Sequence, residues 1–488
     1  METPNFFSSR EDILNFDYSK IEDYINSSID QSFIINNLSP SKNKNQLLIR
    51  YYKSILFGQN HIFISKILND LNNPSANICL PLFNQWNDEV SIDNIIIINH
   101  PEDAERISKM HVKKAPIFKS LLNDSIISTT DNDDWKNQRS EMNPAFLPNL
   151  SLKNVFQESK KRARGISELL IKMSSGYTEP VNMSDFFLNE TQAQLQKAMF
   201  GFSDEFESKT NKKIRDVFSG INIEYLDEFV SEALKETQIS NGPASKIFQN
   251  SDDKMKNIGN MILFAFAGHD TTGHTLTWLL YELCKHPNYK QALIEEIDQY
   301  WLKHGEETYE TFNELPFMTR CIAETLRMWP ALANGTYRQL ERDEKIHGIN
   351  NEMVNVEKGT YVQIINWTRH RNPELWEEPD VFNPDRKFKD SEIWDNAGFG
   401  YYNVQSDRYS PFTYGPRNCL GKNFSHMEMR LILLNLFKNH DFTFDKKQIE
   451  TINDPKYQGI NLFTLGPLDV YGGLMGMYVN IHLRKSKI

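Results

Sequence analysis

One cysteine, Cys419, lies in a stretch of residues that suits a reactive thiolate. The ten residues from Phe412 to Gly421 include two glycines and a proline, which exclude a regular helix or a central strand. Apolar residues recur with helical spacing from Leu420 onward, so Cys419 is predicted at the end of a tight loop, just before a helix. The free N–H groups and the dipole at the beginning of a helix favour negative charge, and therefore favour the thiolate.

The residues around Cys419 suit a flat ligand that carries a carboxylate. Gly415 and Gly421 would let such a ligand approach the backbone closely, and Arg417 provides a fixed cation. Phe412 could shield one side of the sulfur. The alternative is a buried, unreactive cysteine in a turn, which is the usual fate of a lone cysteine. The combination of glycines, an arginine and an aromatic residue at these positions disfavours that alternative.

The whole stretch resembles the haem-binding signature of the cytochrome P-450 superfamily, Phe-x-x-Gly-x-Arg-x-Cys-x-Gly, and it matches every fixed position. The resemblance implies that Cys419 is the axial thiolate ligand of the iron in haem b. It also implies that Phe412, Arg417 and Gly421 belong to the haem-binding site. A thiolate ligand increases the electron density on iron and favours cleavage of the O–O bond.

A long central helix is predicted to begin with Asp252 or Asp253 as its N-cap and to end at about His286. One face of this helix carries a notch of small residues beside an aromatic side chain. A glycine such as Gly268 costs about 1 kcal/mol relative to alanine inside a helix, so a functional reason is expected for it. The residues that share this face are Phe264, Ala267, Gly268, Thr271 and Thr275.

Asp270 and Thr271 lie directly after the notch, and an acid beside an alcohol suits the activation of a diatomic molecule. The alternative is a glycine that permits close helix packing, with Asp270 and Thr271 as ordinary polar residues. The segment resembles the Ala/Gly-Gly-x-Asp/Glu-Thr motif of the same superfamily. The resemblance implies that Asp270 and Thr271 are the catalytic pair for the activation of oxygen.

Trp135 and Arg139 lie about one turn apart on the same face of a predicted helix. In isolation, this pattern fits a surface arginine that covers a core tryptophan equally well. It resembles the Trp-x-x-x-Arg pair of the superfamily, which implies that the pair binds a haem propionate. Arg338 resembles the second propionate-binding arginine.

Glu324 and Arg327 lie on one face of another predicted helix and are surrounded by apolar residues. An exposed pair with this spacing contributes little to stability, whereas the apolar setting predicts a buried pair. The two residues resemble the Glu-x-x-Arg pair of the superfamily, and Arg386 is the implied third partner. This structural triad is expected to hold the loops on the haem side rather than to act as a catalytic acid.

The resemblance also implies O2 as a co-substrate and a small organic compound as the substrate. The apolar character of the predicted pocket favours an apolar compound. Since the sequence contains no flavin or iron–sulfur motif, electrons are expected from a separate reductase or ferredoxin. The predicted pocket residues are Phe264, Ala267, Gly268, Ala331, Leu332, Ala333 and Leu465.

The composition excludes some functions and locations. The formal net charge of −11 argues against a nucleic-acid partner, because such proteins need a basic surface. The four cysteines are scattered, without the spacing of a metal site or a disulfide framework. Residues 1–50 are expected to form a polar extension without a membrane anchor, because no apolar run there approaches the roughly 20 residues that span a bilayer. The predicted location is intracellular, either cytoplasmic or peripherally associated with a membrane.

The order of these motifs along the chain is that of the superfamily. It implies a single haem-containing catalytic domain over residues 51–488, mainly α-helical with a small β-rich part, that acts as a monooxygenase. Two alternatives remain open. One is a haem-thiolate isomerase or dehydratase that rearranges a peroxide, which the presence of both Asp270 and Thr271 disfavours. The other is a non-catalytic haem-binding relative, which is disfavoured because every core motif is intact.

Overall fold

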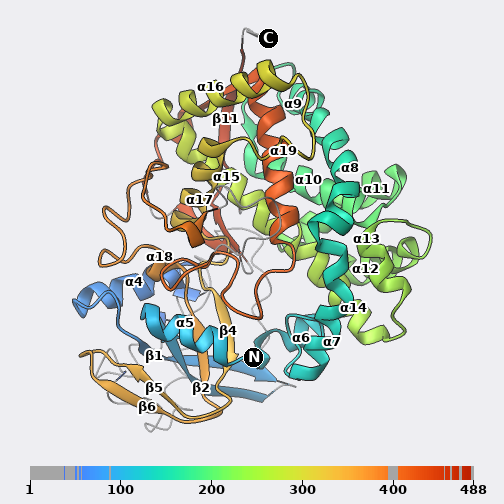
Figure 1. The fold of residues 1–488 in the computed structure, drawn as a ribbon. Coiled ribbons are helices and arrows are strands. Elements are labelled where there is room, and N and C mark those ends of the chain that lie inside the picture. Colours follow the sequence, from blue (N-terminus) through green and yellow to red (C-terminus); the bar gives the residue numbers. More distant parts are fainter. Residues whose placement is uncertain are drawn as a thin grey trace.

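The structure is a computed structural model that describes residues 38, 50–51, 54–55, 58–86, 89–393, 405–454, 457–461, 464–471 and 475–484. Apart from Leu38 and Arg50, the extension predicted for residues 1–50 lies outside these described residues. The described part is mainly helical with a small β-rich part, which confirms the predicted fold class. In Figure 1 the helices fill the upper and middle parts of the molecule, and the largest sheet lies along the lower edge.

The amphipathic stretch between Leu152 and about Asn250 is helical, as its apolar spacing predicts. Its helices are α8 (Lys153–Arg164), α9 (Ile166–Met173), α10 (Met183–Gln194), α11 (Asp204–Phe218), α12 (Tyr225–Thr237) and α13 (Pro243–Gln249). The other helices outside the central segment are α4 (Asn60–Asp70), α5 (Pro101–Met110), α6 (Lys119–Leu122), α7 (Asn132–Met142), α16 (Pro287–His304), α17 (Pro316–Met328), α18 (Trp367–His370), α19 (Lys422–Asn439) and α20 (Lys446–Ile449). Within the described ranges, no helix combines the length and the apolar character needed to cross a bilayer.

A four-stranded sheet explains the run of isoleucines from Ile95 to Ile98. These residues end β2 (Glu89–Ile98), which lies between β1 (Ile78–Trp86) and β7 (Tyr361–Ile364), while β4 (Thr336–Gln339) pairs with the other side of β7. β2 runs antiparallel to β1 and parallel to β7. All of these isoleucines are fully buried. A strand that is buried on both faces has a continuous apolar run instead of an alternating one, which is the pattern seen here.

The two faces of this sheet contribute to two hydrophobic cores. Within Ile95–Ile98, the odd-numbered side chains belong to the large core of the helices, and the even-numbered side chains belong to a smaller core. The smaller core is closed by α5 and by the hairpin of β5 (Glu344–His347) and β6 (Met353–Val356). Because β4 belongs to the same sheet, burial of both faces also fixes the strand that carries Arg338.

Two smaller sheets accompany the helices. Residues near the C-terminus form β11 (Tyr478–Leu483), and this strand pairs antiparallel with β3 (Val181–Asn182) and β8 (His440–Phe444). β9 (Gln458–Asn461) pairs antiparallel with β10 (Thr464–Pro467). This second pair brings a short stretch of backbone against the central helices.

The predicted central helix consists of two helices. α14 (Lys254–Ala267) begins after the predicted N-cap Asp253, whose side chain accepts a hydrogen bond from a backbone amide in the first turn. The chain forms a turn at Gly268 and His269, and α15 (Asp270–Lys285) follows. The prediction of one unbroken helix is therefore wrong.

The interruption has a physical cause in the residues around Gly268. The hydroxyl of Thr271 donates a hydrogen bond to the carbonyl of Ala267 (2.9 Å), the group that an unbroken helix would pair with the Thr271 amide. A Cβ atom at position 268 would lie only 2.7 Å from Cδ1 of Leu195. Glycine at position 268 lets the Leu195 side chain pack directly against the backbone at the turn.

Candidate functional site

Backbone contacts fix the loop that ends at Cys419. The Cys419 amide donates to the carbonyl of Phe412 (2.8 Å), which closes the loop just before α19. Gly415 has a φ angle of 76°, and a Cβ atom there would lie 2.6 Å from the carbonyl oxygen of Ser108. Glycine is therefore required at position 415. The predicted position of Cys419, in a tight loop before a helix, is confirmed.

Cys419 opens into an internal cavity of about 840 Å³. Protein surrounds the rest of the thiol, and this burial raises the pKa of Cys419 above its usual value, although the Gly421 amide and the Arg139 charge act in the opposite direction. The Gly421 amide at the beginning of α19 and the Arg139 charge thus favour the thiolate, and a metal cation at the sulfur would favour it further. A Cβ atom on Gly421 would meet no protein atom within 4 Å, so the backbone there is open to a ligand in the cavity.

Most of the residues that the sequence assigned to the site lie in the wall of this cavity. They are Trp135, Arg139, Phe264, Ala267, Gly268, Thr271, Ala331, Leu332, Phe412, Arg417, Cys419 and Gly421. Four others are buried outside the wall, namely Asp270, Ala333, Arg338 and Leu465. The structure thus brings together residues from distant parts of the chain around one enclosed space.

Three cations, Lys114, Arg338 and Arg417, are buried near one another at the edge of the cavity. None of them forms an ion pair with a carboxylate among the described residues. Burial lowers the pKa of Lys114 well below its usual value, and the charges of Arg338 and Arg417 lower it further. Burial also lowers the pKa of Arg338 to about 9 and that of Arg417 to about 9. The free energy of this cluster would fall if an anion bound beside it.

Hydrogen bonding at this cluster is incomplete. Lys114 and Arg338 both donate to the hydroxyl of Thr336, each at 2.7 Å. Nε and Nη2 of Arg338 are buried and have no hydrogen-bond partner within the described part of the chain. Buried donors without partners are costly, so this edge of the cavity suits a ligand with carboxylate groups. The propionates of haem meet that requirement.

Arg139 and Arg417 connect the cysteine loop to neighbouring segments. Arg139 donates to the backbone carbonyl (2.7 Å) and to the side-chain oxygen (2.8 Å) of Asn418. Arg417 donates to backbone carbonyls in the segment 112–129 and lies 4.4 Å from the ring centroid of Trp135. These contacts hold the loop of Cys419 against the cavity wall.

Asp270 and Thr271 point to different neighbours, although they are adjacent in sequence. Thr271 lies in the cavity wall. The carboxylate of Asp270 accepts a hydrogen bond from the hydroxyl of Thr464 on β10, and its other oxygen lies 3.6 Å from Nδ1 of His274. The alcohol therefore faces the cavity, while the acid is held on the side of the β9–β10 sheet.

Among the lysine, arginine, aspartate and glutamate residues of the cavity wall, sequence reasoning missed two, Lys114 and Glu428. Glu428 lies on α19 and is fully buried, and this burial raises the pKa of its carboxyl well above the usual value, with only partial compensation from Thr272. Burial therefore favours the neutral acid. A lysine in a loop and a glutamate in a helix normally indicate solvent contact, and only the apolar residues around Glu428 in the sequence signalled its burial.

Glu324, Arg327 and Arg386 meet as the sequence predicts. The carboxylate of Glu324 accepts two hydrogen bonds from Arg327 (2.7 and 2.8 Å), and Arg386 Nε donates to it at 3.1 Å. Glu324 and Arg327 are fully buried. Arg327 also donates to the carbonyls of His370 and Pro379, so the pair connects α17 to the loops that follow α18.

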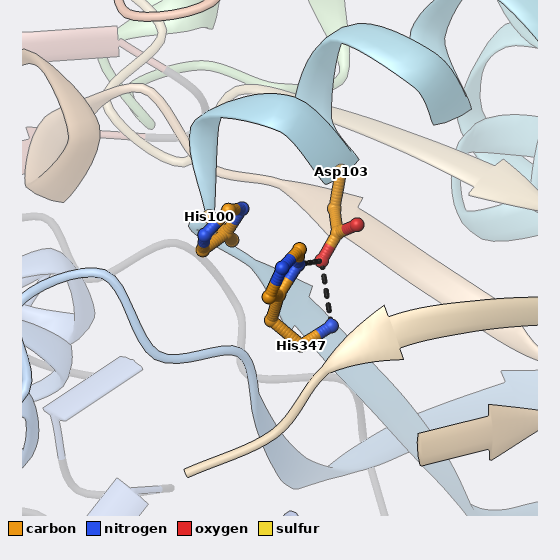
Figure 2. Close-up of side chains that lie close together, drawn as sticks. All are labelled: His100, Asp103 and His347. Carbon is orange, nitrogen blue, oxygen red and sulfur yellow. Dashed lines mark hydrogen bonds and ion pairs between the residues drawn. The ribbon is translucent and has the colours of Figure 1, made fainter. Parts of the chain in front are cut away.

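A second group of possible metal ligands, His100, Asp103 and His347, lies outside the cavity (Figure 2). The two imidazole rings stack with centroids 3.6 Å apart and an interplanar angle of 12°. Lone pairs in parallel planes do not converge on one ion. Oδ2 of Asp103 already accepts from Nδ1 of His347 (3.0 Å) and from Asn77 (2.7 Å), and Oδ1 pairs with Arg106 (2.9 Å). The hydrogen bonds of this group therefore connect α5 to the β5–β6 hairpin.

The fold and the cavity together define a haem-thiolate protein, and comparisons with known proteins agree with this class. The profile of the family described as Cytochrome P450 matches residues 153–467, which is more than half of the chain. The chain belongs to the cytochrome P450 family. It is accordingly an oxidoreductase of the monooxygenase class, with haem as its cofactor.

Individual relatives show the extent of the similarity. Cytochrome P450 3A11 of Mus musculus is 28% identical over 370 residues, which cover 65% of this chain and 69% of that protein. Cytochrome P450 3A12 of Canis lupus familiaris is 27% identical over 370 residues, which cover 65% of this chain and 70% of that protein. The crystal structure of the heme domain of a cytochrome P450DA mutant has a TM-score of 0.66 at 18% identity and covers 88% of this chain and 94% of that chain. At that identity, the structural likeness shows the fold alone.

Replacing Glu324 by alanine should reduce folding and haem retention more than it reduces chemistry. The substitution leaves the buried Arg327 charge without its partner, which costs about 3–5 kcal/mol. Thermal unfolding and haem content per chain measure the effect. The matched control is Glu314→Ala, which removes an exposed partner of Lys303 and should change both quantities little. A Glu324→Ala protein that is stable and fully loaded with haem but selectively inactive would contradict the structural role.

Proposed function

We propose that the protein inserts one atom of O2 into a small apolar organic substrate and reduces the other atom to water. In this proposal, residues 51–488 form one catalytic domain, Cys419 is the axial ligand of haem b, and a separate reductase or ferredoxin supplies the electrons. The main support is the position of Cys419 in the wall of a cavity whose edge carries buried cations without paired carboxylates.

The buried cations at the cavity edge would attract the propionates of haem, and this attraction supports the binding of haem in one orientation. Arg338 offers two unpaired N–H groups, and the ammonium of Lys114 lies beside it, so both suit the haem propionates. Trp135, Arg139 and Arg417 extend this side of the site. Haem bound there supplies the reduction of O2 and the cleavage of its O–O bond. The opening at Gly421 and the ring of Phe412 lie beside the sulfur side of the same space.

The wall of the cavity supports an apolar substrate. Phe146 and Phe264 stack with ring centroids 5.8 Å apart, and aliphatic side chains such as Leu263 and Leu332 continue this surface. Apolar substrate surface that leaves water here contributes about 25 cal/mol per Å² to binding. Ala331 adds little volume beside Leu332, which leaves room for the substrate.

Proton supply is the proposed role of Asp270 and Thr271. Reduction of one oxygen atom to water consumes two protons. The hydroxyl of Thr271 lies in the cavity wall and rotates about a single bond, so it can hold water or donate toward the cavity instead of toward Ala267. Asp270, which precedes Thr271 in the chain, can relay protons from solvent, as positioned acids do in general acid catalysis.

Replacing Cys419 by alanine should abolish the thiolate-type spectrum that reduced haem gives with carbon monoxide. The substitution removes the thiol that this loop presents in the wall of the cavity. Absorbance of the reduced, carbon monoxide-treated protein measures the change. Cys284→Ala is the control, because burial raises the pKa of Cys284 to about 12 and it lies away from the cavity. An unchanged thiolate spectrum in Cys419→Ala would refute the assignment.

Replacing Lys114 by methionine should weaken haem binding by roughly 30-fold, because a hydrogen bond to a charged group contributes about 2 kcal/mol. The same change should stabilise the haem-free protein. A lysine whose pKa is lowered in the folded state binds fewer protons than it does in the unfolded chain, so it destabilises the fold at pH values below its unfolded pKa of about 10.4. The stability gain should therefore shrink as the pH rises toward that value.

Haem transfer to apomyoglobin and urea unfolding of the haem-free protein at two pH values measure these effects. Lys119→Met is the control, because Lys119 is part of an exposed ion pair with Asp124. If Lys114→Met retained haem as tightly as the parent, Lys114 would not be a partner of the propionates.

Replacing Thr271 by alanine should lower the product formed per reduced nicotinamide consumed by at least about tenfold, since positioned proton donors contribute roughly 100-fold or more. More of the consumed reductant should end as hydrogen peroxide, while haem and substrate binding persist. Thr277→Ala is the control, because Thr277 is buried on α15 away from the cavity. Equal coupling in Thr271→Ala and the parent would mean that another group supplies the protons.

A further inference from the structure

A buried polar cluster joins α15 to β10, outside the cavity. Asp270 and His274 lie one turn apart on α15, and Nδ1 of His274 is 3.6 Å from Oδ1 of Asp270. The hydroxyl of Thr464 on β10 is bonded to Oδ2 of Asp270 and lies 3.2 Å from Nδ1 of His274. The three residues are 7%, 2% and 0% exposed, respectively, so bulk water does not compete for these contacts.

The direction of the hydrogen bonds follows from the number of protons. A carboxylate only accepts hydrogen bonds, so the single hydroxyl proton of Thr464 is directed to Asp270. Thr464 must then accept from Nδ1 of His274, which therefore carries a proton. The result is an ordered chain in which His274 donates to Thr464 and Thr464 donates to Asp270.

The His274 ring packs against the backbone of β10. A Cβ atom on Gly466 would lie 2.7 Å from Cδ2 and 2.8 Å from Nε2 of this ring. Nε2 is buried and has no hydrogen-bond partner among the residues that the structure describes. The ring is therefore fixed by packing on one side and by the bond to Thr464 on the other.

We propose that His274 is a positioning residue for the oxygen-activation pair, which holds Asp270 toward β10 through Thr464. This inference rests on the proposed role of Asp270 and Thr271. The bond from Nδ1 of His274 occupies the Thr464 oxygen and directs the Thr464 hydroxyl proton to Asp270. Without that bond, the hydroxyl can turn away and the Asp270 carboxylate is no longer held in one orientation.

Other titratable groups near the cluster are accounted for. Burial lowers the pKa of His269, which precedes α15, to about 4, so this ring is neutral at pH 7. Arg215 of α11 is bonded to Asp185 of α10. Glu190 of α10 is paired with Arg162 (2.9 Å), and β10 brings no charged side chain. These groups are common to the parent and to the variants below, so a difference between variants reports His274.

The test uses the infrared stretching band of carbon monoxide on the reduced haem protein, which senses charge near the cavity and needs neither substrate nor redox partner. In His274→Leu, which removes the donor to Thr464, the band should move away from its position in the parent while haem content remains. His274→Asn keeps an N–H donor and should restore the position of the parent's band. His286→Leu, at the far end of α15, should leave the band unchanged. An identical band in His274→Leu and the parent would overturn the proposal.

The link through Thr464 has its own matched pair of variants. Thr464→Val removes the hydroxyl at nearly constant volume, so Asp270 is released from β10 and the band should move at every pH. Thr464→Ser keeps the hydroxyl and should match the parent. Identical bands in Thr464→Val and the parent would refute the chain. A protein that gives no thiolate-type carbon monoxide complex at all would instead refute the proposed function, so the two failures are distinguishable.

Discussion

Positive charge that is buried without a carboxylate partner is the constraint on which the rest of this structure depends. Lys114, Arg338 and Arg417 are held near one another at the cavity edge, and burial lowers the pKa of each. Such an arrangement persists only because the surrounding structure forces it. The buried isoleucines of β2 fix the sheet that carries Arg338, and backbone carbonyls of the segment 112–129 fix Arg417. The fold therefore holds three buried cations that would be stabilised by an anion bound at the edge of the cavity.

Two fully buried arginines, Arg327 and Arg338, differ in their partners. Arg327 has its own carboxylate in Glu324, with Arg386 as a second cation on the same acid. Arg338 has only the hydroxyl of Thr336 and a backbone carbonyl. The first arrangement is complete and connects helices to loops, whereas the second is complete only with a ligand. The same residue type thus serves the stability of the fold in one place and ligand binding in another.

The sequence predicted those features that depend on short stretches of chain. The loop of Cys419 and the N-cap Asp253 follow from local turn and capping chemistry, and the structure has both. The break in the central helix was missed, because there the hydroxyl of Thr271 takes the carbonyl of Ala267, which the Thr271 amide would bond in an unbroken helix. Helix propensities do not show which acceptor a side chain will bond.

Burial and orientation were the other limits of prediction. Lys114 appeared as an ordinary loop lysine, because nothing next to it in sequence reveals the two arginines that surround it in the fold. The direction of Asp270 depends on Thr464, which comes from a strand near the other end of the chain. Most residues of the candidate site were therefore predictable from motifs. The charge state of each side chain and the direction in which it points were not. The predicted extension of residues 1–50 lies outside what the structure describes, Leu38 and Arg50 apart.

The close approach of Gly466 to the His274 ring restricts how this chain can change during evolution. With a histidine at position 274 and a methionine at position 475, a Cβ atom at position 466 would force a neighbour to shift, so the three positions are coupled. A larger residue at 466 is accepted most easily together with smaller ones at 274 and 475. The order in which substitutions accumulate on α15 and β10 is therefore constrained, and relatives that carry a histidine at 274 should carry a glycine at 466.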